Sequence, residues 1–305
     1  MRILLIGQAA FGAKVLERLS AQSENVVAVY APPDGPGGRT DPLKEAAVTA
    51  GIAVYQPETY KDDQIFADFQ ELKPDLTVMA FVTDIIPPRL LEVPSMGSIC
   101  YHPSILPRHR GASAINWAVI MGDTQTGLSI FWADGGIDTG PILLQKTIDI
   151  GPEDTTGSLY FNQLFPMGVD AMIESVDLIK AGNAPRVIQD ETGATYEPPC
   201  DDAAAGIDWQ KPARDIHNLI RGCDPQPGAF TSLGDEKVCF YGAALEQTAT
   251  DQAPGTVIGV DSGICIAVAG GQLTVTKVRT STHGKIAATE FAADIGLKAG
   301  DRFGA

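Results

Sequence analysis

Cysteine is scarce in this sequence and follows no pattern. The chain has five cysteines, an odd set without a CxxC pair: Cys100, Cys200, Cys223, Cys239 and Cys265. Disulfide frameworks and zinc sites need paired cysteines at short, regular spacings. We therefore expect neither a disulfide-stapled secreted domain nor a metal site, and a reducing cytoplasm is the expected compartment.

Positive charge is also in short supply. The chain carries 22 Lys and Arg against 38 Asp and Glu, which gives a formal net charge of −16. Such a charge repels a phosphate backbone unless a local basic patch overcomes it. Even residues 201–305 contain nine basic and thirteen acidic side chains. The balance counts against nucleic acid, tRNA included, as a partner.

Long hydrophobic runs are missing as well. A membrane-spanning helix needs ~20 consecutive apolar residues, and no apolar segment approaches that length. The apolar start of the chain, MRILLIGQ, is interrupted at Gly7 and Gln8 before it reaches the length of a signal-peptide core. These features predict a soluble cytoplasmic protein that does not enter a membrane.

The same N-terminal segment lacks one glycine of the dinucleotide-binding pattern. In the stretch IGQAAFG, Gly7 and Gly12 occur without the middle glycine of GxGxxG, which lets a pyrophosphate approach the backbone. We therefore interpret both glycines as structural and expect no bound NAD(P).

Strand and helix patterns alternate through the first part of the chain. Apolar runs typical of buried strands cover residues 2–6, 26–30, 53–55 and 76–80, and helical spacing covers residues 13–19, 43–50 and 62–72. This alternation is typical of a Rossmann-like α/β domain with a mainly parallel, doubly wound sheet.

The length of the chain favours a second domain, because single hydrophobic cores rarely keep growing beyond ~250–300 residues. A helix predicted over residues 159–180 precedes a stretch with little periodicity, which we interpret as a linker at about residues 183–205. We expect an α/β domain over residues 1–200 and a small C-terminal β-barrel, OB-like, over residues 206–305. The C-terminal prediction comes from one helical pattern and several short strands between glycine turns, at residues 207–222, 238–245, 255–260, 264–269 and 273–278.

Two polar segments follow predicted strands, where α/β folds place their ligands. The first, YHPSILPRHRGASAINW, begins at Tyr101 and contains two histidines, His102 and His109. The second, SIFWADGGIDTGPIL, contains Asp134 and Asp138 in a glycine-rich loop. Either aspartate could simply accept hydrogen bonds from turn amides, and Asp134 fits that interpretation better.

A histidine and an aspartate on separate strand-end loops can meet and form an acid–base pair. The residues alone do not choose between His102 and His109.

Together, the two segments resemble the signature of a known enzyme family, the folate-dependent formyltransferases and 10-formyltetrahydrofolate hydrolases. One family motif, a histidine followed by S-L-L-P-x-x-R-G-A, stands here as His102, Ser104, Ile105, Leu106, Pro107, Arg110, Gly111 and Ala112. The other, D-x-G-x-D-T-G, stands as Asp134, Gly136, Asp138, Thr139 and Gly140.

Within this family, the chain resembles most the N-terminal hydrolase domain of 10-formyltetrahydrofolate dehydrogenase, and next methionyl-tRNA formyltransferase. The stretch IDWQKPARDIHNLIRGCDPQPGAFT also resembles the start of the family's C-terminal barrel. The transferases place an asparagine two residues before the histidine, where its amide would steady the developing oxyanion. Here that position is Cys100, and the hydrolase domain likewise lacks the asparagine.

The resemblance implies a site. His102 and Asp138 would be catalytic, with Cys100 at the asparagine position. Arg110 would either meet the glutamyl tail of folate or stay solvated on its loop. The pterin would lie against backbone and apolar groups at the end of the fourth strand, directly after it and in the two loops: Met79, Ala80, Phe81, Leu106, Pro107, Ala133, Asp134, Gly135 and Gly136.

The implied activity uses 10-formyltetrahydrofolate as substrate, without a metal or NAD(P). The enzyme would release formate and tetrahydrofolate, or pass the formyl group to a small amine. Three alternatives stay open: a methionyl-tRNA formyltransferase, an N-formyltransferase of amino-sugar nucleotides, and a folate-binding protein without catalysis. The oligomeric state is not predicted.

Overall fold

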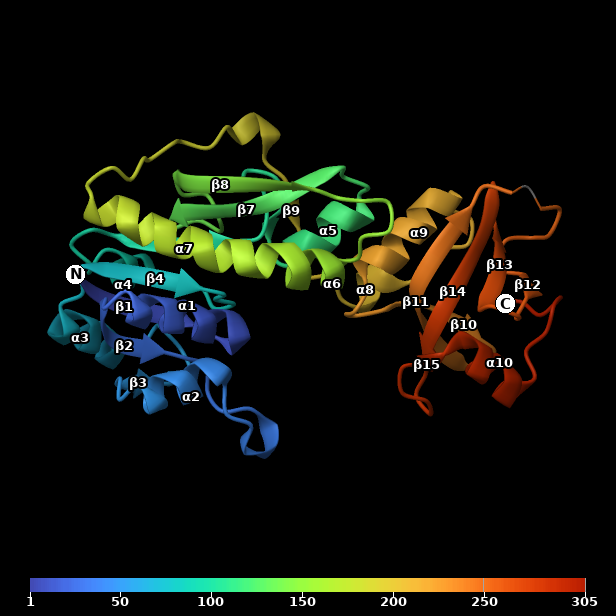
Figure 1. Cartoon of the computed structure of the whole chain (residues 1–305), viewed down its shortest axis with the longest axis horizontal. Coiled ribbons are helices and arrows are strands. Elements are labelled where there is room, and N and C mark those ends of the chain that lie inside the picture. The colour runs from blue at the N-terminus through green and yellow to red at the C-terminus, as the bar shows by residue number, and fades with distance from the viewer. Residues whose placement is uncertain (249, 305) are drawn as a thin grey trace. The chain divides into compact units, whose positions relative to one another are not determined.

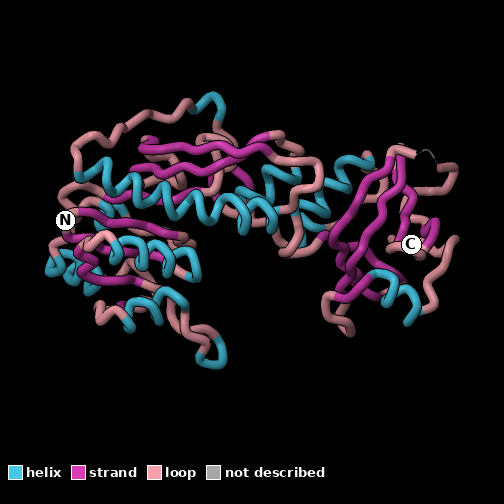
Figure 2. Tube along the Cα trace, viewed as in Figure 1, coloured by secondary structure: helices cyan, strands magenta, loops and turns pink. Residues whose placement is uncertain are grey.

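The computed structural model describes residues 1–248 and 250–304. The chain forms two compact units, and each is assembled from several segments. The first unit contains residues 1–111, 127–148 and 162–196, and the second contains residues 112–126, 149–161 and 197–305. Figures 1 and 2 show that each unit has its own sheet.

The first unit is built on a seven-stranded sheet with the order β3-β2-β1-β4-β5-β7-β8 (Figure 1). Strand β1 pairs in parallel with β2 and β4, β2 with β3, and β4 with β5, whereas β7 is antiparallel to β5. The strands are β1 (Arg2–Gly7), β2 (Asn25–Tyr30), β3 (Val54–Tyr55), β4 (Leu76–Ala80), β5 (Ser98–His102), β7 (Gln125–Trp132) and β8 (Ile142–Asp149).

Helices cover both faces of this sheet. Apolar residues of α1 (Ala9–Ala21), α2 (Pro42–Thr49) and α7 (Phe165–Lys180) share a core with one face, and those of α3 (Asp63–Leu72) and α4 (Pro88–Leu91) share a core with the other. Side-chain caps start two of these helices: Asp41 accepts from the amide of Leu43, and Asp62 from that of Gln64. Shorter elements are β6 (Arg110–Gly111), β9 (Tyr196–Glu197) and 3₁₀ turns at Pro36–Gly38 and Glu191–Gly193.

Strand alternation sets the face on which β5 presents its polar end. Ile99 and Tyr101 lie in the core beneath α1 and α7, whereas Cys100 lies in the core beneath α3 and α4. Successive side chains of a strand point to opposite faces, so His102 follows Cys100 onto the α3/α4 side.

The second unit carries an antiparallel sheet with the order β10-β11-β14-β13-β12, and β15 pairs with β14. Its strands are β10 (Ala229–Leu233), β11 (Glu236–Glu246), β12 (Val257–Gly259), β13 (Ile264–Val268), β14 (Gly271–Arg279) and β15 (Ile286–Ala287). Aromatic side chains fill the core, with Phe240 and Phe303 edge to face at 5.1 Å between ring centroids. This architecture is consistent with the small barrel expected from the sequence.

The described residues of the second unit also form the short helices α5 (Ala114–Ile120), α6 (Thr156–Leu159), α8 (Asp202–Ala205), α9 (Ala213–Gly222) and α10 (Ala288–Ile295). Helix α5 packs on α9, and the Asn116 amide of α5 donates to the carbonyl oxygens of Gly222 (2.7 Å) and Gln226 (3.1 Å). A Cβ on Gly222 would lie 2.4 Å from Ile120, so the glycine permits the close approach of the two helices.

The structure confirms the mainly parallel sheet of the first unit and the antiparallel strands of the C-terminal part. It corrects the bounds of two predicted helices. The predicted helix over residues 159–180 divides into the end of α6, a π-helical turn at Tyr160–Leu164 and α7. In residues 207–222 only α9 is helical, because Pro212 stands at its N-cap. Among the residues that the structure describes, no helix is both long and apolar enough to cross a membrane.

Candidate active site

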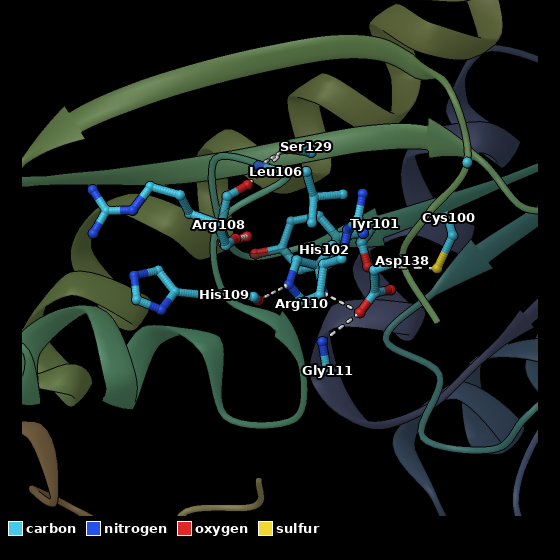
Figure 3. A network of polar contacts seen from close by, with 12 residues as sticks. Cys100, Tyr101, His102, Leu106, Arg108, His109, Arg110, Gly111, Ser129 and Asp138 are labelled. Carbon is cyan, nitrogen blue, oxygen red and sulfur yellow. Dashed lines mark hydrogen bonds and ion pairs between the residues drawn. The ribbon is translucent and has the colours of Figure 1, made fainter. Parts of the chain in front are cut away.

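His102 ends β5 and lies almost fully buried, with 7% of its side chain exposed. Its ring contacts an oxygen atom on each side: Nε2 lies 2.7 Å from the carbonyl oxygen of His109, and Nδ1 lies 3.4 Å from Oδ2 of Asp138 (Figure 3). A carbonyl oxygen only accepts, so Nε2 carries a hydrogen. The short contact fixes the ring, while the longer one leaves Nδ1 facing the carboxylate.

His109 contacts the His102 ring through its backbone carbonyl oxygen. Its φ of 56° is left-handed, and its amide donates to the hydroxyl of Thr195 at 2.8 Å. In Figure 3 the His109 side chain points away from the pair of His102 and Asp138. The two histidines that the residues alone did not separate therefore have different positions: one contributes a ring, the other a carbonyl oxygen.

The loop between these histidines is fastened to the neighbouring strands. Ser129 of β7 accepts a hydrogen bond from the amide of Leu106 (3.1 Å) and donates to the carbonyl of Ser104 (2.7 Å). Gln145 of β8 donates to the Leu106 carbonyl and to the Ser129 hydroxyl, both at 2.9 Å. These contacts bury Leu106 beside the His102 end of β5.

Asp138 arrives from a loop that joins two strands. In the mainly parallel sheet predicted from the sequence, residues 133–140 would form a βα loop. The strand β7 instead runs antiparallel to β5 and leads into β8, so this connection is not a βα loop. Its return is tight: a Cβ on Gly140 would lie 1.7 Å from the carbonyl oxygen of Trp132. Within it, Asp138 adopts a left-handed φ of 56°, and its Oδ2 accepts from the amide of Gly111 at 2.8 Å.

Cys100 is a neutral thiol in this setting. Burial, reinforced by the negative charge of Asp138, raises the pKa of the Cys100 thiol far above its ordinary value. Its Sγ lies 3.6 Å from the carbonyl oxygen of Tyr101. A thiol held protonated by its surroundings is a poor nucleophile, so covalent catalysis through Cys100 is disfavoured.

The other residues implied by the resemblance divide into buried and exposed groups. Met79, Ala80 and Leu106 are buried, Pro107 and Ala133 are partly exposed, and Phe81, Asp134, Gly135 and Gly136 are exposed. The Asp134 carboxylate accepts from the Gly136 amide (3.0 Å) and the Thr139 hydroxyl (2.6 Å). Asp134 thus shapes the turn.

Arg110 is not solvated, contrary to one of the two sequence expectations. Its side chain is fully buried, and its guanidinium donates to carboxylate, amide and phenol oxygens of Glu191, Gln189 and Tyr196. Hydrogen bonds to Glu191 and Tyr196 hold the pKa of Arg110 above its ordinary value. The donors of Arg110 are thus engaged by neighbouring side chains.

Exposed apolar side chains occur on both segments that flank the pair. Phe81 is 42% exposed directly after β4, Ile85 is 73% exposed, and Ile137 beside Asp138 is 54% exposed. The two segments come close where a Cβ on Gly135 would lie 3.4 Å from Pro88. Large apolar groups left in solvent around a polar pair are typical of a ligand site.

Sequence reasoning missed the backbone groups and one side chain of this site. The carbonyl of His109 and the amide of Gly111 have no sequence signal, because every residue carries these groups. Gln189 also went unnoticed, although it donates to the carbonyl oxygens of Asp138 (2.8 Å) and Gly140 (2.7 Å). Its position in an aperiodic stretch gave no pattern that could have revealed it.

Comparison with known proteins agrees with the motifs. Residues 1–176 match the Formyl transferase family, and residues 201–295 match the Formyl transferase C-terminal domain. The chain is 45% identical over 250 residues to mitochondrial 10-formyltetrahydrofolate dehydrogenase of Mus musculus, covering 80% of this chain and 27% of that protein. It is 37% identical over 298 residues to methionyl-tRNA formyltransferase of Trichlorobacter lovleyi, and the match covers 96% of this chain and 93% of that protein.

Solved structures share the fold at low sequence identity. HypX from Aquifex aeolicus, in complex with tetrahydrofolic acid, matches with a TM-score of 0.69 at 17% identity, over 97% of this chain and 48% of that one. The sugar 3N-formyl transferase WlaRD matches with a TM-score of 0.70 at 17% identity, over 93% and 98%. From the family matches and the 37% identity along nearly its whole length, the chain belongs to the formyl transferase family.

Proposed function

We propose that this protein hydrolyses 10-formyltetrahydrofolate to formate and tetrahydrofolate, with His102 and Asp138 as the catalytic residues. The observation that carries the proposal is the contact between His102 Nδ1 and Asp138 Oδ2, at 3.4 Å, in a chain of the formyl transferase family. The 45% identity to a 10-formyltetrahydrofolate dehydrogenase supports water as the acceptor, although the chain spans about a quarter of the length of the first relatives that it matches.

The pair can move the protons that this reaction requires. Water attacks the formyl carbon as Asp138 accepts its proton, and the formyl oxygen becomes an oxyanion. In this step His102 acts as an imidazolium: the hydrogen on Nε2 stays on the His109 carbonyl, and the second hydrogen, on Nδ1, stabilises the oxyanion. The 3.4 Å contact is longer than a tight charge-assisted hydrogen bond of ~2.8 Å. Nδ1 is therefore available to the oxyanion, while Nε2 stays bound to the His109 carbonyl.

Collapse of the tetrahedral intermediate breaks the bond between carbon and N10. The leaving nitrogen takes up the proton that Asp138 had accepted, so the pair returns to its starting state. The products are tetrahydrofolate and formic acid, which ionises in water.

The exposed apolar groups fit a flat heteroaromatic substrate. Phe81, Ile85 and Ile137 together offer apolar surface on both segments beside the catalytic pair. Covering such surface with a pterin ring would favour binding at ~25 cal/mol per Å² of apolar area. The backbone of the two loops would then orient the ring.

A second candidate is transfer of the formyl group to an amine, including that of charged methionyl-tRNA. The alignment with a methionyl-tRNA formyltransferase covers 93% of that relative, far more than the share of the dehydrogenases covered. Against it stand Cys100 in place of the oxyanion-steadying amide and the acidic balance of residues 201–305.

The acceptor is tested by incubating the purified protein with 10-formyltetrahydrofolate and following tetrahydrofolate and formate. We expect stoichiometric formate with water alone. Strict dependence on a small amine, an amino-sugar nucleotide or charged methionyl-tRNA would replace hydrolysis by transfer. Binding of the folate without turnover under every condition would leave a folate-binding protein.

A further inference from the structure

Gln189 reaches the catalytic loop from a distant part of the chain. It lies between α7 and the turn at Glu191–Gly193, and its side chain is buried, with 7% of the residue exposed. Its amide nitrogen donates to the carbonyl oxygens of Asp138 at 2.8 Å and Gly140 at 2.7 Å. Both hydrogens of the NH₂ group are thus spent on the backbone of one short loop.

The other end of the same amide is bound to Arg110. Oε1 of Gln189 accepts from Nη2 at 2.8 Å and from Nε at 3.2 Å. With two donors and two acceptor sites occupied, the amide has a single favourable orientation. A carboxylate in its place could keep the arginine but would face two carbonyl oxygens without a hydrogen to offer.

Arg110 is in turn fixed from outside. Its Nη1 and Nη2 donate to the two carboxylate oxygens of Glu191 at 2.9 and 2.6 Å, and Nη1 also donates to the hydroxyl of Tyr196 at 2.6 Å. Among the described residues, Glu191 thus reaches this network through Arg110. This separation provides a matched control.

The loop needs such support because its conformation is unfavourable in isolation. A left-handed φ is unfavourable for a residue other than glycine and persists only where surrounding contacts enforce it. Asp138 is held at φ 56° by Gln189 at its carbonyl and by the Gly111 amide at its carboxylate. Both contacts are made by the residue whose Oδ2 lies 3.4 Å from His102 Nδ1.

We propose that Gln189 is a positioning residue for catalysis: its amide fixes the backbone of Asp138 and so sets the separation between Asp138 Oδ2 and His102 Nδ1. The assignment rests on the proposed function, in which this pair moves the protons of formyl hydrolysis. Gln189 does not touch the reacting atoms and acts through Asp138.

The test compares Gln189→Met, which keeps the length of the side chain but loses all four hydrogen bonds, with Glu191→Gln in the full-length protein. We expect Gln189→Met to lower kcat by roughly 10–100-fold, with KM for 10-formyltetrahydrofolate within about threefold, because a displacement of ~1 Å near the chemistry can cost this much. Glu191→Gln should lower the melting temperature but retain most of kcat. Gln189→Glu should resemble Gln189→Met.

A crystal structure of Gln189→Met separates this proposal from the proposed function. We expect the same fold with Asp138 Oδ2 displaced by ~1 Å from its wild-type position, 3.4 Å from His102 Nδ1. An unmoved pair, or equal loss of kcat in both folded variants, would overturn the positioning role. If the wild-type protein released no formate, the proposed function would fail, and the displacement of Asp138 would still decide whether Gln189 positions it.

Discussion

His102 and Asp138 reach the same point from different kinds of structure. His102 is the last residue of a buried strand, and the pairing of β5 with β4 and β7 places it. Asp138 stands in a loop with a left-handed backbone, held by groups from elsewhere in the chain. One half of the pair is therefore placed by regular structure, and the other by individual hydrogen bonds.

Removing the imidazole of His102 or the carboxylate of Asp138 should cause the largest loss of activity, and the loss should be similar for the two residues. We expect His102→Ala and Asp138→Ala each to lower formyl release by roughly 10²-fold or more, since acid–base groups act mainly in the transition state. Folate affinity, measured by calorimetry with a non-reactive 10-formyl analogue, should change little. His109→Asn, which keeps the carbonyl and suits a left-handed φ, is the control; greater loss there than in His102→Ala would refute the assignment.

A change in the loop that carries Asp138 should test whether this half of the pair depends on its local backbone. Gly140→Ala puts a Cβ 1.7 Å from the Trp132 carbonyl oxygen, so the loop must shift. We expect the free energy of unfolding, from urea titration, to fall by about 1–3 kcal/mol, together with a loss of kcat. Gly284→Ala, whose Cβ would meet nothing within 4 Å, should leave both quantities unchanged. An active, fully stable Gly140→Ala protein would mean that the loop tolerates displacement.

Replacing Cys100, which lies near both His102 and Asp138, should have a smaller effect on turnover and in the opposite direction. Cys100→Asn supplies an amide that can hydrogen-bond the developing oxyanion, and we expect turnover to rise, provided that the buried position accepts the extra atoms. Cys100→Ser, which is closer in size to cysteine and lacks the amide, should not give this gain. Equal turnover in all three proteins would show that this position does not face the formyl oxygen.

The smallest expected effect concerns stability in the second unit. Burial lowers the pKa of His217 from its usual 6.5, and its Nε2 lies 3.1 Å from the Ala243 carbonyl oxygen. Below pH 6.5 the unfolded chain therefore binds a proton more readily than the folded one, so stability should fall as the pH falls. We expect the melting temperature to drop by a few degrees more between pH 7.5 and 5.5 in the wild type than in His217→Gln. An identical slope would remove His217 from the pH response.

The predictable part of this protein is the part that local patterns specify. The alternation of strands and helices predicted the mainly parallel sheet. The two motifs predicted His102 and Asp138, whose Nδ1 and Oδ2 atoms lie 3.4 Å apart. The direction of β7 was not predictable, since a strand buried on both faces has the same apolar pattern whichever way it runs.

Arg110 shows why the long-range side-chain contacts of the site could not be predicted. A charged residue in a polar loop is normally solvated, and it is buried here because its partners Gln189, Glu191 and Tyr196 lie 79 to 86 residues away. No local pattern encodes such contacts. The same applies to the 51 residues that separate Gln189 from Asp138.

The packing of α5 on α9 has a consequence for how the chain matures during synthesis. Four residues of α5 are buried (Ala114, Ile115, Ala118 and Val119), and the helix packs on α9, which begins only at Ala213. At translation rates of ~5–20 residues per second, α5 would leave the ribosome several seconds before this partner exists. The helix α5 would thus reach its final environment only late in synthesis.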